Sequence, residues 1–218
     1  DGYGDVIIGA PQQSAVILRE GKAFLYRGGP GGLSPTPDWT SSGDGYREGH
    51  YGLPLDGAGD VNGDGYDDVA VSAPDQGVAP TRFGKIYIYA GSASGLSPNT
   101  SWSITPVRDY WRTGHALSTA GDIDGDGRSD LLVLGRSHAA PVSQDGEIRL
   151  ILGGPGGPQS VSAWTYRGDG PMVSFSPGSA SPAGDVDGDG YPEILLGEPY
   201  YMVSGVNSGK ASLFCGIR

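Results

Sequence analysis

The stretch that decides the fold reads Gly59-Asp-Val-Asn-Gly-Asp-Gly-Tyr-Asp-Asp68. It recurs without gaps at offsets of 62 and then 63 residues, as Gly121-Asp-Ile-Asp-Gly-Asp-Gly-Arg-Ser-Asp130 and Gly184-Asp-Val-Asp-Gly-Asp-Gly-Tyr-Pro-Glu193. A partial fourth copy, Asp1-Gly2-Tyr3-Gly4-Asp5, aligns with residues 64–68, so we expect the chain to begin inside a repeat. A period of about 63 residues predicts a protein built from similar units in series.

Each unit carries the signals of four β-strands. A short apolar run follows every acidic stretch, then come a glycine-led alternating segment, a segment that contains tryptophan, and a segment that leads into the next acidic stretch. The predicted strands are the apolar runs Val6–Ile8, Val69–Val71, Leu131–Leu134 and Ile194–Leu196, the glycine-led segments Gly21–Tyr26, Gly84–Tyr89, Gly146–Ile151 and Gly209–Phe214, the segments around Trp39, Trp102 and Trp164, and the leading segments Tyr51–Gly59, Thr113–Gly121 and Phe175–Gly184.

Four strands in one repeat is the size of a β-propeller blade. The sequence therefore predicts an all-β propeller segment of about three and a half four-stranded blades, with repeat units at about 1–49 (truncated), 50–111, 112–174 and 175–218 (truncated). Such a stack leaves bare sheet faces and strand edges at its ends, so we expect it to be a portion of a larger ring or to need a partner chain. An open β-solenoid is the alternative architecture.

The composition has two opposing features. The 40 Gly and 17 Pro would suggest a low-complexity chain if there were no period, whereas 37% hydrophobic residues provide apolar surface to bury. A net charge of −11 disfavours nucleic acid and anionic membranes as partners, and the apolar runs are too short for membrane insertion. A single cysteine, Cys215, permits no intrachain disulfide. The acidity leaves cations as the natural ligands.

The acidic stretches have the spacing of oxygen-rich cation loops. Side-chain oxygens stand at loop positions 1, 3, 5 and 9, the position 7 carbonyl can point inward, and glycines at positions 4 and 6 permit a tight curl. Position 12, a Glu ligand in an EF-hand, is Val71, Val133 or Leu196, so each loop should enter a strand and not a helix. Fourteen of the 25 acidic residues lie in the four loops. Calcium is favoured over magnesium, because it accepts larger and more flexible oxygen cages.

These motifs together resemble the FG-GAP repeats of the integrin α-subunit β-propeller and its bacterial relatives. Tyr51-Gly52 stands for the Phe-Gly pair, and Ser72-Ala73-Pro74 stands for the Gly-Ala-Pro end, which is intact at Gly9-Ala10-Pro11. The resemblance implies a seven-bladed ring, calcium between the first and second strands of a blade, and an extracellular or cell-surface location.

The resemblance also implies a set of Ca²⁺ ligands. There would be three intact sites and a fourth that is truncated at the N-terminus, with the residue at position 7 offering its main-chain carbonyl. The implied ligands are Asp60, Asn62, Asp64, Tyr66 and Asp68; Asp122, Asp124, Asp126, Arg128 and Asp130; Asp185, Asp187, Asp189, Tyr191 and Glu193; and Asp1, Tyr3 and Asp5.

Outside these loops no catalytic constellation stands out, and we expect the segment not to be an enzyme. His50 and His115 fall near matching repeat positions, which indicates structural roles. The recurring tryptophans are expected to pack between blades, whereas Trp111 does not recur and is the better candidate for a ligand contact. The tripeptide Arg167-Gly168-Asp169, which some integrins recognise, is not surprising in a chain this rich in Gly and Asp.

The preferred hypothesis is a non-catalytic, calcium-binding propeller module for extracellular protein or glycan recognition and adhesion. Its partners would be an extracellular protein or glycan, and the remainder of the propeller or a second chain that closes the ring. The alternatives are the propeller portion of a secreted carbohydrate-active enzyme or phospholipase with catalytic residues elsewhere, and a lectin that stacks aromatic side chains on sugars. The sequence does not identify the residues that bind this ligand.

Overall fold

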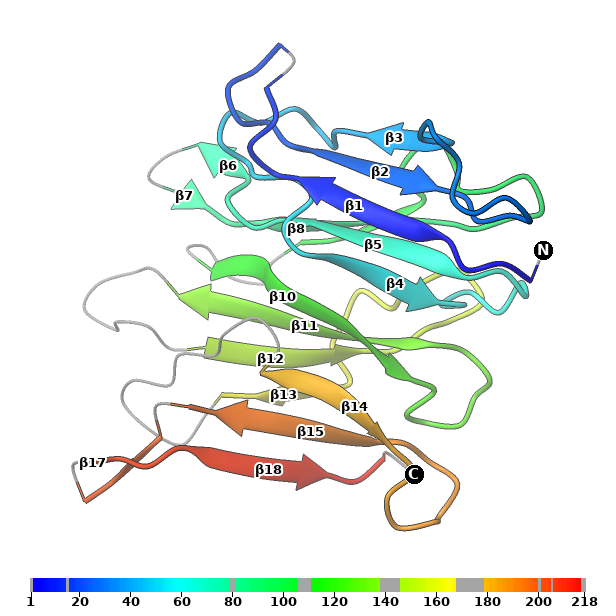
Figure 1. Cartoon of the computed structure of the whole chain (residues 1–218). Helices are drawn as coiled ribbons and strands as arrows, with labels where there is room; N and C mark the ends of the chain where they lie inside the picture. Colours follow the sequence, from blue (N-terminus) through cyan, green and yellow to red (C-terminus); the bar gives the residue numbers. More distant parts are fainter. Residues whose placement is uncertain are drawn as a thin grey trace.

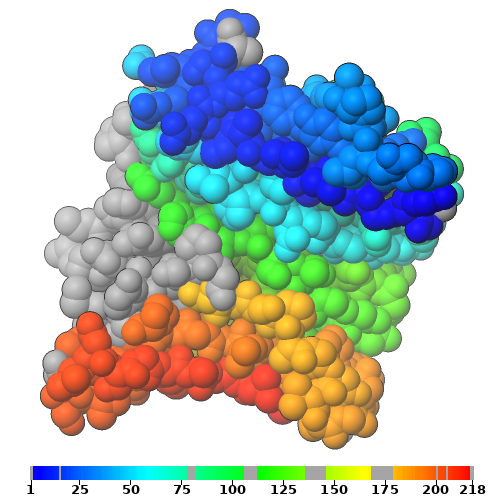
Figure 2. Space-filling model, in the orientation of Figure 1, coloured from blue at the N-terminus to red at the C-terminus, as the bar shows by residue number. Residues whose placement is uncertain are grey.

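Four antiparallel β-sheets are stacked in chain order, as Figure 1 shows from blue to red and Figure 2 shows as successive bands. The computed structural model describes residues 2–14, 16–78, 81–105, 111–137, 146–167, 179–199, 201–204 and 206–216. In this part of the chain every regular element is a β-strand. The predicted all-β fold is confirmed.

Within each sheet the neighbouring strands follow one another in sequence, apart from short inserted hairpins. The first sheet contains β1 (Val6–Ala10), β2 (Lys22–Tyr26) and β3 (Trp39–Ser41). The second contains β4 (Leu55–Gly59), β5 (Asp68–Ala73), β8 (Lys85–Tyr89) and β9 (Trp102–Ile104). The third contains β10 (Trp111–Gly121), β11 (Asp130–Ser137), β12 (Gly146–Ile151) and β13 (Trp164–Tyr166). The fourth contains β14 (Ala180–Gly184), β15 (Glu193–Glu198) and β18 (Lys210–Phe214).

Two short hairpins interrupt this order and were not predicted from the sequence. The pair β6 (Gly77–Val78) and β7 (Thr81–Arg82) lies between β5 and β8, and the pair β16 (Met202–Val203) and β17 (Val206–Asn207) lies between β15 and β18. Both hairpins project from the left side of the stack in Figure 1. Strands of two residues are too short to show the period-2 alternation on which the sequence prediction rests.

Every complete unit breaks its strand ladder at the same place, immediately before the acidic loop. Register shifts occur between Gly57 and Gly59 in β4, between Thr119 and Gly121 in β10, and between Pro182 and Gly184 in β14. The glycine that ends each shift has a φ of 67°, 74° or 72°, a backbone region that strains other residues. This β-bulge directs the chain out of the sheet and into the loop.

Alternate residues of the central strands enter different hydrophobic cores. In β8, Tyr87 and Tyr89 belong to the core against the first sheet, whereas Ile86 and Ile88 belong to the core against the third sheet. The strands β5 and β12 are buried along their whole length. Strands that are covered on both faces explain why the apolar runs are continuous and do not alternate with polar residues.

The recurring tryptophans pack between neighbouring sheets, as predicted. Trp39 Nε1 donates a hydrogen bond of 2.9 Å to the carbonyl oxygen of Ser97 in the next unit. A methyl group on Gly157 would lie 2.2 Å from the ring of Trp102, so this tryptophan also reaches the following unit. The ring centroid of Trp164 lies 5.0 Å from that of the phenylalanine that ends β18. Each short outer strand is thereby attached to the next sheet.

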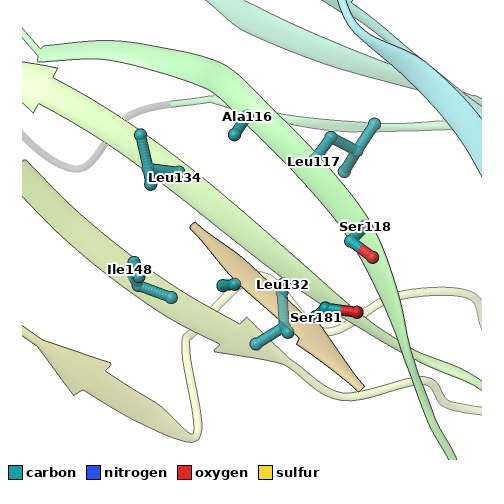
Figure 3. A pocket seen from close by; sticks show the side chains of 8 residues that line it. Ala116, Leu117, Ser118, Leu132, Leu134, Ile148 and Ser181 are labelled. Carbon is teal, nitrogen blue, oxygen red and sulfur yellow. The ribbon is translucent and has the colours of Figure 1, made fainter. Parts of the chain in front are cut away.

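A cavity of about 280 Å³ remains between the third and fourth sheets. Figure 3 shows Leu132, Leu134 and Ile148 on one side and Ser181 of β14 on the other. Its eight lining residues are apolar apart from two serines, and none is titratable. The cavity is a packing gap between blades.

Candidate metal centres

The three complete acidic loops connect the first and second strands of their sheets. They lie on one side of the stack, the right side in Figure 1, where the N-terminal residues also lie. The predicted entry of each loop into a strand is confirmed, because β5, β11 and β15 begin at loop position 9, which is occupied by Asp68, Asp130 and Glu193.

The position 1 aspartates hold their loops in a curl. Asp60 Oδ1 accepts hydrogen bonds from the amides of Gly63 at 2.7 Å and Asp64 at 3.0 Å, and Asp60 Oδ2 accepts one from Gly65 at 2.7 Å. Burial acts to raise the pKa of Asp60, but these amides hold it below its ordinary value. Asp185 accepts the same three bonds within its own loop, so the sequence repeat is also a geometric repeat.

The carboxylates at position 9 are buried under the loops. Asp68 accepts hydrogen bonds from the amides of Val61 at 3.0 Å and Gly91 at 2.8 Å. Asp130 accepts the equivalent pair from Ile123 and Gly153, both at 2.8 Å. Burial raises the pKa of each of these carboxyl groups to about 6. These groups therefore join the loop to the sheet and also present an acidic side chain at its base.

The fourth-sheet loop brings its four acidic residues together most completely. Carboxylate oxygens of Asp185, Asp187, Asp189 and Glu193 lie within 4.8 Å of one another. The Glu193 side chain is 1% exposed, and its Oε1 atom has no hydrogen-bond partner among the described residues. An unpaired buried carboxylate oxygen is costly unless a cation compensates it. These residues therefore fit a bound metal ion.

The other two loops bring fewer carboxylates together: three cluster in the third-sheet loop, and no group of three is found among the described residues of the second-sheet loop. In the third-sheet loop, Asp122, Asp124 and Asp130 form a cluster, but Asp126 Oδ2 instead accepts a 2.6 Å ion pair from Arg128 Nη1. In the second-sheet loop, the amide nitrogen of Asn62 donates to Asp64 Oδ2 at 2.9 Å. Hard cations prefer the carboxylate and carbonyl oxygens that all three loops supply.

The N-terminal partial loop is described only from Gly2 onward. Asp5 Oδ1 accepts a 2.9 Å hydrogen bond from the amide of Gly28, which matches the bond from Gly91 to Asp68. Tyr3 is half exposed. Asp1 lies outside the described residues, so the fourth site stays a prediction.

A charged cluster at the start of the first inserted hairpin escaped the sequence analysis. Asp75 Oδ2 lies 2.8 Å from His50 Nδ1, and Asp75 Oδ1 lies 3.1 Å from Arg112 Nε and 3.6 Å from Arg82 Nη1. This pair supports the structural role predicted for His50, which stays a prediction. His50, Asp75 and Arg82 lie in one predicted unit and Arg112 begins the next, but no motif links them, so the sequence analysis did not join them.

Two other features of the sequence analysis lie partly outside the described residues. They are the side chain of Trp111 and residues 168–169 of the Arg-Gly-Asp tripeptide. Arg167 is described, and its Nε donates to Glu147 Oε2 at 2.7 Å. Cys215 is a free, exposed thiol that directly follows β18. No helix in the described part of the chain is long and apolar enough to cross a membrane.

Four-stranded antiparallel sheets stacked face to face, with an acidic loop between the first two strands, are the blades of a β-propeller. Sequence comparisons agree with this class. The model of the FG-GAP-like repeat matches residues 60–133, and that of the FG-GAP repeat matches residues 177–214. The chain belongs to the FG-GAP repeat family, and its propeller segment is integrin α-like.

The chain is similar to parts of much longer proteins. Integrin alpha-4 of Xenopus laevis is 32% identical over 136 residues, which cover 61% of this chain and 13% of the integrin. Integrin alpha-PS2 of Drosophila melanogaster is 40% identical over 148 residues, or 61% and 10% of the two chains. Phosphatidylinositol-glycan-specific phospholipase D of Homo sapiens is 30% identical over 187 residues, or 78% and 22%. The chain thus spans less than a quarter of each of these relatives.

Proposed function

We propose that this chain is a non-catalytic, calcium-binding propeller module that serves extracellular protein or glycan recognition. The observation that carries the calcium part is the buried Glu193 Oε1, which has no hydrogen-bond partner among the described residues and lies beside three aspartates. A divalent cation at this place would compensate four carboxylates at once.

The donor set favours Ca²⁺ over the other common cations. It consists of carboxylate, amide and main-chain oxygens, without sulfur or imidazole in the loops, and this excludes a preference for zinc or copper. Calcium tolerates the irregular cages and the bidentate carboxylates that magnesium resists. We propose three sites, with Asp60, Asn62, Asp64 and Asp68, then Asp122, Asp124, Asp126 and Asp130, then Asp185, Asp187, Asp189 and Glu193 as side-chain ligands, and with Tyr66, Arg128 and Tyr191 as carbonyl ligands.

The recognition part of the proposal has support in a larger cavity. It measures about 650 Å³ and lies between the first and second sheets, on the side of the acidic loops. Its lining includes Tyr3, Tyr66, Asp67, Arg27 and Ser92. Aromatic rings beside carboxylate, guanidinium and hydroxyl groups are the side chains that sugars contact through stacking and hydrogen bonds.

A covering chain for the two end sheets is also part of the proposal. Ile8 on the first sheet and Leu195 and Leu213 on the fourth are each 48% exposed, although they belong to strands. Sheet faces with exposed branched residues are the faces that a neighbouring blade would cover in a closed ring. We infer that further blades or a second copy of the chain pack here.

The second candidate function is the propeller portion of a secreted enzyme. Similarity to phosphatidylinositol-glycan-specific phospholipase D favours it, since that name describes a catalytic protein. The sequence carries no recognised catalytic motif, so in this alternative the catalytic residues would lie elsewhere in the parent protein.

Metal content and binding assays test the proposal. Inductively coupled plasma mass spectrometry after gel filtration in calcium should give close to three Ca²⁺ per chain, and EDTA should lower the melting temperature by more than about 10 °C, since three saturated sites stabilise the folded state by several kcal/mol. A glycan array and a panel of extracellular proteins, probed with and without calcium, test recognition. Hydrolysis of a glycosylphosphatidylinositol substrate by this chain would overturn the non-catalytic assignment, and an unchanged melting temperature after verified calcium removal would overturn the calcium assignment.

A further inference from the structure

Neighbouring acidic loops contact each other directly. The amide of Ser129, at position 8 of the third-sheet loop, donates a 2.8 Å hydrogen bond to the carbonyl oxygen of Asp60 in the second-sheet loop. A methyl group on Gly63 would lie 3.1 Å from Arg128 Nε, and one on Gly125 would lie 2.5 Å from the ring of Tyr191. In the third-sheet and fourth-sheet loops, the position 7 side chain therefore lies against the glycine at position 4 of the preceding loop.

The residue at position 7 also differs between the loops in its charge. The residue is tyrosine in two of the complete loops, Tyr66 and Tyr191, and arginine in the third, Arg128. Neutral rings at this place add no charge beside the carboxylates. Arg128 adds the one positive side chain found in the four loops of the sequence.

The arginine pairs with one of the carboxylates of its own loop. Arg128 Nη1 lies 2.6 Å from Asp126 Oδ2, and the amide of Arg128 donates to Asp126 Oδ1 at 2.9 Å. Asp126 is missing from the cluster of oxygens that Asp122, Asp124 and Asp130 form, whereas the equivalent Asp189 belongs to the cluster of the fourth-sheet loop. A cation that recruits Asp126 must compete with the guanidinium for its carboxylate.

We propose that the side chain of Arg128 lowers the calcium affinity of its own loop, so that the Asp122 loop binds calcium more weakly than the Asp185 loop. The inference rests on the calcium binding proposed above. Arg128 acts here as a specificity-determining residue through its guanidinium, in addition to the carbonyl that it offers as a ligand. A unit charge about 5 Å from a divalent cation lowers its affinity roughly tenfold even in a water-like dielectric.

Site-resolved calcium titration by nuclear magnetic resonance tests this inference. The amides of Gly127 and Gly190 donate to Asp122 Oδ2 and Asp185 Oδ2 at 2.9 and 3.0 Å, so their signals report the two loops separately. We expect half-saturation at Gly127 to need about ten times more free calcium than at Gly190. Arg128→Gln should lower the Gly127 midpoint about tenfold and leave Gly190 nearly unchanged.

Arg128→Lys is the matched control, because it keeps the positive charge on a side chain of similar length. It should keep the high Gly127 midpoint, and a lowered midpoint in this variant would overturn a charge mechanism. Equal midpoints at Gly127 and Gly190 in the unchanged chain, or no shift with Arg128→Gln, would overturn the inference while calcium binding stands. If neither glycine signal responds to calcium, the proposed function itself fails.

Discussion

At the scale of single residues, the three loops differ in the hydrogen bonds of the side chain at position 9. Asp68 and Asp130 each have both carboxylate oxygens bonded to main-chain amides. Glu193 is one methylene longer, and its Oε2 accepts from the amide of Val186 while Oε1 is left without a partner among the described residues. The extra length thus releases one buried oxygen toward the acidic cluster.

Glu193→Gln should therefore lose stability mainly when calcium is present. The amide keeps the shape but removes the charge that a cation would balance, so the free energy of unfolding should fall by up to about 3 kcal/mol in millimolar calcium. In EDTA the difference should shrink or reverse, because three neighbouring aspartates repel the carboxylate. Urea unfolding in both buffers measures this.

Asp67→Asn is the control for this variant. It removes the same charge from an exposed position 8 of an acidic loop, outside the oxygen clusters. Equal losses in the two variants, or a Glu193→Gln loss that is independent of calcium, would contradict the role given to Glu193.

At the scale of elements, close contacts between a short outer strand and the next unit hold the stack together. Gly157 has a φ of 94°, and a methyl group there would lie 2.2 Å from Trp102. A methyl group on the neighbouring Gly156 would meet no atom within 4 Å. The two positions form a matched pair that differs in packing.

Gly157→Ala should destabilise the chain by about 1–3 kcal/mol, because it combines a clash with a strained φ. Gly156→Ala should change the free energy of unfolding by less than about 0.5 kcal/mol. Thermal and urea unfolding of both variants measures this contrast. Similar losses would show that the Trp102 contact does not join the second and third units.

The buried tyrosines between the first two sheets predict a pH dependence. Tyr51 Oη donates to Tyr89 Oη at 2.9 Å, and burial raises the pKa of Tyr51 far above its usual range. A raised pKa means that the folded chain keeps a proton that the unfolded chain releases above about pH 10. The stability from this group is therefore complete below pH 10 and is lost as pH rises further.

Tyr51→Phe should destabilise the chain at pH 7 and stabilise it near pH 11.5. At pH 7 the variant should be less stable by about 1 kcal/mol, since it loses a buried hydrogen bond. Near pH 11.5 it should be the more stable chain by about 1 kcal/mol, because the unchanged chain loses about 1.4 kcal/mol per pH unit above pH 10. Urea titrations at both pH values check the crossing, and parallel curves would exclude it.

At the scale of the whole molecule, the two end sheets expose branched residues that the inner sheets bury. Leu213 on the fourth sheet pairs with Leu195 across strands β18 and β15, and both side chains point away from the core. Leu18 has the same exposed fraction of 48% but lies in a loop of the first unit. Substitutions at Leu213 and Leu18 therefore compare an exposed leucine on a sheet face with an equally exposed leucine in a loop.

Leu213→Lys should shift the chain toward the monomer in light scattering coupled to size-exclusion chromatography. A charge on the face opposes the burial that self-association requires. Leu18→Lys should leave the mass distribution unchanged. A chain that is monomeric at 100 μM, or the same response from both variants, would exclude a second copy as the cover of this face.

Features that depend on residues close together in the sequence could be predicted, and features that depend on contacts between distant segments could not. The glycine-led strands were placed to within one residue, because a positive-φ glycine such as Gly84 or Gly209 and an alternating run are local signals. The hairpin of β6 and β7 was missed, because two-residue strands carry no period. The Asp75 cluster was missed because no motif links Asp75 to the separate segments that supply its partners.

The sequence by itself determined the number and order of the blade strands, the position of each acidic loop and the chemistry of its oxygens, since these depend on neighbouring residues within a unit. Only the tertiary structure decided which of those oxygens are left without partners. Burial of Glu193 depends on how loop and sheet pack, and the place of Arg128 depends on the approach of two successive loops. Distances between units are set by the stacking of sheets, which no local pattern encodes.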